Sequence, residues 1–111
     1  MTGDTRDTLD TYPDEEWFAL RLAVVGAPSH VIQAVVPDLQ EELRQRDYLR
    51  APRVAWDPQT QWTIVDVEDQ GYDPQRTAED MAEELFEITA SVLGDFESFH
   101  IDILDVRPHG A

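Results

Sequence analysis

Apolar residues recur at every third or fourth position between residues 72 and 94, which is the spacing of one face of an α-helix. Asp73 and Pro74 suit the start of this helix, because a carboxylate can accept from free N–H groups and proline fits the first turn; Gly94 suits its end. The predicted apolar stripe comprises Ala78, Met81, Ala82, Leu85, Ile88, Thr89 and Val92. Such a stripe has to be covered, so the helix predicts a second layer of structure.

Alternation of apolar and polar residues predicts strands elsewhere. Residues 16–25 alternate throughout and predict a strand with two usable faces. Residues 52–71 predict a β-hairpin that turns at residues 57–60, where Pro58 suits the second turn position. Residues 99–106 alternate again and predict the last strand.

The segment after the first predicted strand is ambiguous. Ser29 can cap a helix that continues to residue 47, but Pro37 lies inside it and four of the six residues 31–36 are β-branched. A strand over residues 31–36 followed by a shorter helix is therefore the alternative. We favour a kinked helix, because the apolar stripe stays in phase through the proline.

The predicted order is strand, helix, strand, strand, helix, strand. With right-handed crossovers, the simplest compact arrangement is an α+β sandwich: a four-stranded antiparallel sheet in the spatial order 4-1-3-2 with both helices on one face. This architecture resembles the ferredoxin-like fold, and the resemblance rests on element order alone over residues 16–107. Many unrelated functions use that fold, so it implies none of them.

The length of 111 residues predicts one domain, over residues 16–107. Residues 1–15 are rich in Thr and Asp and predict a disordered acidic tail, and residues 108–111 a short C-terminal tail. The chain starts with no basic leader, and no apolar run approaches the roughly 20 residues that span a bilayer. We therefore expect a cytoplasmic protein without a membrane partner.

Charge is the most unusual property of the composition. The chain has 24 acidic residues, eight arginines and no lysine, for a formal net charge of −16. This excess resembles the proteins of halophilic microbes and predicts a salt-rich cytoplasm, where ions screen the self-repulsion. The alternative is a surface for a basic partner or divalent cations. Nucleic acid is not an expected partner, because binding phosphate requires cationic side chains, and the absence of cysteine excludes disulfides and thiolate chemistry.

If the helices cover one face of the sheet, alternation assigns the residues of the other face, which we call the open face. The expected core side comprises Phe18, Leu20, Leu22, Val54, Trp56, Val65, Val67, Phe99, Ile101 and Ile103. The expected open face comprises Trp17, Ala19, Arg21, Ala23, Trp62, Ile64, Asp66, His100, Asp102, Leu104 and Val106. Its apolar residues predict an interface, and Arg21 is expected to pair with Asp66 or Asp102.

Candidate chemistry is sparse. His100 and Asp102 lie two apart on one strand face, a spacing that suits a divalent metal or a proton-transfer pair, but two ligands do not make a site. No nucleophile, phosphate-loop or calcium-loop motif is present, so no catalytic residue, metal or cofactor is predicted.

The leading hypothesis is a non-enzymatic interaction or regulatory module that binds a second copy or another protein through its open face. The predicted interface comprises Trp17, Arg21, Trp62, Ile64, Asp66, His100, Asp102 and Leu104. The alternative is a small dimeric enzyme with a cleft at that face that uses His100, Asp102 and Arg21. A third possibility is an accessory subunit of another protein.

Overall fold

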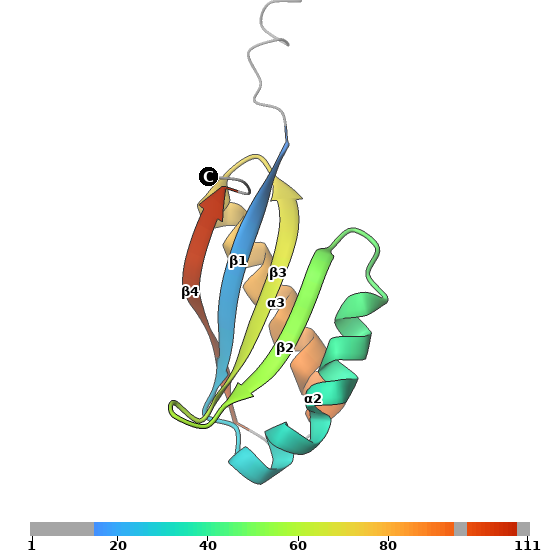
Figure 1. Ribbon diagram of the computed structural model, residues 1–111, viewed down its shortest axis with the longest axis vertical. Helices are drawn as coiled ribbons and strands as arrows, with labels where there is room; N and C mark the ends of the chain where they lie inside the picture. The colour runs from blue at the N-terminus through green and yellow to red at the C-terminus, as the bar shows by residue number, and fades with distance from the viewer. Residues whose placement is uncertain (1–14, 95–97, 109–111) are drawn as a thin grey trace, which may run out of the picture.

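Four strands and two helices alternate along the chain in the predicted order (Figure 1). The computed structural model describes residues 15–94 and 98–108. Its elements are β1 (Glu16–Val25), α2 (Ser29–Arg44), β2 (Arg50–Asp57), β3 (Trp62–Gly71), α3 (Pro74–Leu93) and β4 (His100–Pro108). The strands form one antiparallel sheet in the order β2-β3-β1-β4, which confirms the predicted topology and is consistent with a ferredoxin-like fold.

Both helices pack on the same face of the sheet; in Figure 1, α3 runs behind the strands and α2 lies at the right, next to β2. Between the two layers lies one hydrophobic core. Its buried residues are Phe18, Leu20, Leu22, Val24, Ile32, Leu39, Leu43, Leu49, Val65, Val67, Ala78, Met81, Leu85, Ile88 and Leu93. The even-numbered residues of β1 therefore face the helices and its odd-numbered residues face away, as alternation predicts.

Helix α3 has the predicted ends. Asp73 accepts a hydrogen bond from the backbone N–H of Arg76 at 2.7 Å, Pro74 is the first helical residue, and Gly94 ends the helix with a φ of +86°. The predicted stripe faces the core, with Ala82 and Val92 half-buried at its margins.

Helix α2 runs without a break through Pro37, so residues 31–36 are helical and the strand alternative is wrong. Pro37 is exposed, while Ile32, Leu39 and Leu43 are buried. Ser29 is the first helical residue rather than the cap, which is Pro28. Burial of the apolar stripe outweighs the β-branched content of this segment, because packing contributes more than propensity to a helix in a protein.

Each edge strand contains a β-bulge, a site where one strand has an extra residue. In β4 the extra residue is Leu104, because Arg21 pairs with Asp105 while Leu22 pairs with Ile103. In β2, Ala51 and Pro52 lie opposite Val67 alone, and Ala51 has a φ of +50°. A bulge reverses the alternation beyond it.

The bulge in β4 corrects one sequence-based expectation. Val106 was expected on the open face, but it pairs with Leu20 and packs against the core. Asp105 takes its place opposite Arg21.

The predicted tails fall mostly outside the described residues. Of residues 1–15 only Glu15 is described, and it is exposed. At the other end, Pro108 pairs with Phe18 as the last residue of β4, and residues 109–111 lie beyond the described part. Within the described chain, neither helix combines the length and the apolar character needed to cross a bilayer.

Candidate interaction surface on the open face

The open face presents its side chains in rows, because the antiparallel register aligns residues across the four strands. One row runs from Arg53 on β2 through Asp66 on β3 and Arg21 on β1 to Asp105 on β4. Its charges alternate in sign across the whole sheet, and we call it the charged row. Arg21 and Asp66 were predicted from the sequence, whereas Arg53 and Asp105 were not.

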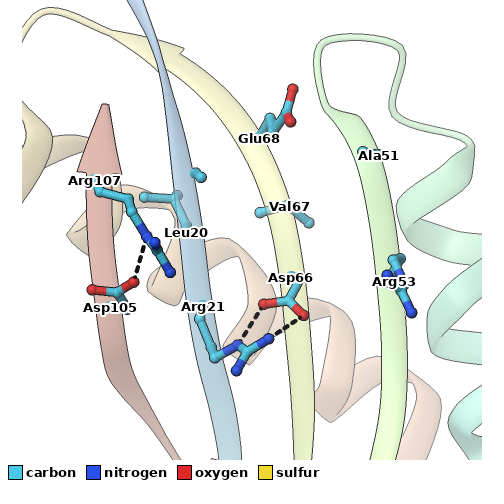
Figure 2. A pocket seen from close by; sticks show the side chains of 10 residues that line it. Leu20, Arg21, Ala51, Arg53, Asp66, Val67, Glu68, Asp105 and Arg107 are labelled. Carbon is cyan, nitrogen blue, oxygen red and sulfur yellow. Dashed lines mark hydrogen bonds and ion pairs between the residues drawn. The ribbon is translucent and has the colours of Figure 1, made fainter. Parts of the chain in front are cut away.

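The centre of the charged row is a bidentate ion pair. Arg21 donates from Nε to Oδ1 of Asp66 at 2.8 Å and from Nη2 to Oδ2 at 3.1 Å (Figure 2). This hydrogen bonding and the Asp66 charge raise the pKa of the Arg21 guanidinium, so the guanidinium is positively charged at any physiological pH. The Arg21 side chain keeps 56% of its exposure, which leaves the pair accessible to a partner.

A hollow of about 260 Å³ lies on this face beside the charged row (Figure 2). Its lining residues are Ala19, Leu20, Arg21, Ala51, Arg53, Asp66, Val67, Glu68, Asp105 and Arg107. Three arginines balance three carboxylates, so the lining of the hollow has no formal net charge, although the formal net charge of the whole protein is −16. The small side chains of Ala19 and Ala51 leave room between the longer charged ones.

The partners of the lining arginines differ. Arg107 donates to Asp105 at 2.8 Å on the same strand. Arg53 faces Asp66 in the strand register, yet it makes no ion pair with any residue that the structure describes. Arg53 is therefore the cation of the charged row that a partner can engage most readily.

A second row continues the charge pattern toward the end of β3. Arg50 forms an ion pair with Glu68 at 3.4 Å, and its guanidinium lies over the Trp17 ring, 3.6 Å from the centroid. This stacking half-buries the Trp17 side chain, which is consequently less available than the sequence suggested.

The two faces of the molecule differ in charge. Four of the eight arginines, Arg21, Arg50, Arg53 and Arg107, belong to the open face. Helices α2 and α3 together carry eight acidic residues and only two arginines. Another copy or an acidic protein would meet much less repulsion at the open face than at the helical one.

The opposite end of the open face is apolar. Ile64 aligns with Ala55 on one side and Ala23 on the other, and Trp62 lies two residues away on the same strand. Trp62 and Ile64 are half-buried and Ala23 is fully buried, so this apolar area is smaller than predicted. Leu104, at the bulge, is 40% exposed.

The structure does not bring together the three residues of the enzyme hypothesis. His100 Nε2 lies 3.3 Å from Asp102 Oδ1, with the His100 side chain largely exposed and the Asp102 side chain half-buried. Neither residue lines the hollow, and Arg21 is opposite Asp105 rather than Asp102. Within the described residues, no group of three or more His, Asp or Glu side chains is placed to hold a metal ion.

The charged row was only half predicted from the sequence: the bulge in β4 shifts Asp105 onto the open face, and Arg53 was not assigned to a face although Val54 had been placed on the core side. One signal was present: Ile101 and Ile103 are two apart, whereas the next core residue, Val106, is three further on. Charged residues on both sides of Val106 pointed to the same shift. The positive φ of Ala51 had no comparable signal, since glycine is the usual residue there.

Comparisons with protein-family models, with curated proteins and with solved structures found no significant match to this chain.

Proposed function

We propose that this protein is a small non-enzymatic interaction module of ferredoxin-like architecture that associates with another protein through its open face. The observation that carries the proposal is the charged row, in which positive and negative side chains alternate across all four strands. Complementary charge at an interface gives specificity and fixes register more than it adds affinity. A regular row of this kind suits recognition of a partner with a matching pattern.

Apolar contact next to the charged row supports the same proposal. Trp62 and Ile64 are half-buried within the monomer, so each has side-chain surface left for a partner. Tryptophan and arginine are the residues most enriched among those that dominate binding energy. Arg53 and Trp62 are the leading candidates here.

The test is the mass in solution, measured by size exclusion with light scattering in about 0.1 M and in molar KCl. We expect the wild type to exceed the monomer mass and Trp62→Asp to be a folded monomer by circular dichroism. Tyr72→Asp is the matched control, because Tyr72 is a 63% exposed aromatic residue outside the sheet. A wild-type dimer whose mass Trp62→Asp leaves unchanged would contradict the proposal, whereas a monomeric wild type in both salts would exclude self-association and leave a different protein as the partner of this face.

We also propose that the protein works in a salt-rich cytoplasm. Support comes from the net charge of −16 and from the acidic helices, where Glu79, Glu83 and Glu87 follow one another at four-residue steps. Like charges at this spacing destabilise a helix unless salt screens them.

The His100–Asp102 contact favours a second candidate, a small dimeric enzyme with a cleft at the open face. A small-molecule screen by thermal shift tests it. A ligand whose binding is lost in His100→Ala, in a variant that keeps its fold and mass, would favour the enzyme. Unchanged ligand binding in His100→Ala, together with dimer loss in Trp62→Ala, would favour the interaction module.

A further inference from the structure

We propose that the partner of the open face is a second copy of this chain, packed face to face about a two-fold axis that runs parallel to the strands. This inference rests on the proposed function and adds the identity of the partner and its orientation. It is carried by the order of charges in the charged row together with the strand order β2-β3-β1-β4.

A two-fold axis between the two sheets and parallel to the strands reverses the strand order of the second copy. Strand β2 then lies over the partner's β4, and β3 lies over the partner's β1. Each row of aligned residues therefore faces the same row of the partner, read in the opposite direction. The charged row reads plus, minus, plus, minus from β2 to β4, and its reverse has the opposite sign at every position. Arg53 therefore faces the partner's Asp105, and Asp66 faces the partner's Arg21.

A two-fold axis perpendicular to the strands gives the opposite result. When that axis passes through the charged row, each strand lies over its own copy, so that Arg53 faces the partner's Arg53 and Asp66 faces the partner's Asp66. Like charges facing each other across an interface cost several kcal/mol. The charge order therefore selects the axis parallel to the strands.

The neighbouring rows fit the same orientation less closely than the charged row does. The apolar row is the row of Ala55, Ile64, Ala23 and Asp102. In it, Ile64 lies over the position of the partner's Ala23, whose side chain is already covered within its own monomer. In the row of Arg50 and Glu68, the space over Ala19 faces the partner's Glu68. Arg50 faces the partner's Arg107 at the solvent-exposed edges, where each already has its own carboxylate, Glu68 or Asp105.

The size of the face suits a dimer. Four strands spaced about 4.8 Å apart and eight to ten residues long cover a footprint of about 600 Å² on each copy. Two such footprints amount to about 1,200 Å², which is the lower end of specific protein interfaces.

Charge exchange tests whether Arg21 and Asp66 meet across the interface. We expect Arg21→Asp alone and Asp66→Arg alone each to be a folded monomer, since each places like charges opposite one another. A mixture of the two variants restores opposite charges at every position of the row, so it is expected to form a heterodimer. Neither variant retains the internal Arg21–Asp66 pair, and recovery therefore reports contact between copies. A mixture that stays monomeric, or single variants that stay dimeric, would overturn the inference.

Crosslinking tests the orientation. The chain has no cysteine, so Ala55→Cys and Asp102→Cys introduce unique thiols at opposite edges of the apolar row. Facing sheets lie about 10 Å apart, too far for a disulfide, so the probe is a short bis-maleimide. We expect efficient crosslinking in the mixture of the two variants and little in either alone.

The two tests separate the inference from the proposed function. Self-crosslinking of Ala55→Cys alone, with a dimer that Trp62→Asp still dissociates, would overturn the orientation and leave the interaction surface intact. A dimer whose mass Trp62→Asp does not change would refute the interaction surface itself, and a wild-type monomer would overturn only the inference that the partner is a second copy.

Discussion

Arg21 and Asp66 lie directly opposite each other on the two central strands and form a bidentate ion pair at 2.8 and 3.1 Å. The pair is exposed to solvent, with 56% of the arginine and 36% of the aspartate side chain accessible. Exposed ion pairs contribute little to folding. The pair is thus available to the partner that we propose for the open face.

We predict that Asp66→Asn lowers the free energy of unfolding by less than about 1 kcal/mol, because solvent screens the pair that it breaks. Urea unfolding in about 0.1 M salt, with the variant held monomeric by Trp62→Asp, is the measurement. Arg53→Gln in the same background is the control, since Arg53 makes no ion pair with a described residue. A loss of several kcal/mol would assign the pair a structural role.

Gly71 lies against Thr77, and this contact predicts a sensitive position. A Cβ added at Gly71 would fall 2.0 Å from Oγ1 and 3.2 Å from Cβ of Thr77, whose hydroxyl donates to the Asp73 carbonyl at 2.7 Å. We expect Gly71→Ala to destabilise the fold by about 1–3 kcal/mol, as overpacking does.

A double-mutant cycle isolates the Gly71–Thr77 contact. Thr77→Ala alone loses one hydrogen bond, and in combination with Gly71→Ala it is expected to cost less than the two single changes added together. If the stability losses of Gly71→Ala and Thr77→Ala were strictly additive in the double variant, Gly71 would be required for a reason other than its contact with Thr77.

Ala51 has a φ of +50° at the bulge of β2, a conformation that costs a side-chain-bearing residue about 1–2 kcal/mol. We predict that Ala51→Gly raises the free energy of unfolding by about 0.5–1 kcal/mol and that Ala51→Val lowers it. Thermal unfolding compares the three proteins. An equal loss of stability in Ala51→Gly and Ala51→Val would be inconsistent with backbone strain at this residue.

Asp69 gives a pH-dependent prediction. Burial raises the pKa of its carboxyl above the ordinary value of 3.8; the hydrogen bond from the Gln70 N–H opposes the shift, and the charges of Glu84, Asp80 and Glu15 add to it. Below pH 3.8 the group is protonated in both the folded and the unfolded state. As the pH rises through the higher folded-state pKa, the unfolded chain ionises more readily and stability is lost.

Asp69→Asn is therefore expected to be more stable than the wild type at pH 7, since Oδ1 still accepts from Gln70. Chemical unfolding at a series of pH values should show this difference shrinking toward pH 3.8. A variant less stable than the wild type at pH 7 would refute the argument.

Glu83 on α3 has Glu79 and Glu87 four residues away on either side. We predict that Glu83→Gln stabilises the protein by about 0.4–1 kcal/mol at low salt, because it removes two like-charge contacts, and that molar KCl abolishes the gain. Glu41→Gln is the matched control, because Glu41 lies 4.0 Å from Arg44 and should gain nothing. A gain that persists in molar KCl would indicate a cause other than charge repulsion.

Local chemistry was enough to predict much of the fold. Asp73, Pro74 and Gly94 mark the ends of α3 through capping and backbone conformation, which depend on neighbouring residues alone. The order of elements limited the sheet to one simple topology, which the structure confirms. Even the helix through Pro37 followed from the phase of its apolar stripe.

The charged row was decided by tertiary structure. Its members come from four strands, and which residues align depends on the register of every pairing. The bulges at Ala51 and Leu104 each shift that register by one residue, which moves Asp105 onto the open face and Val106 into the core. The alternation of a strand determines its two faces, but only pairing with its neighbours determines which charges meet across the sheet.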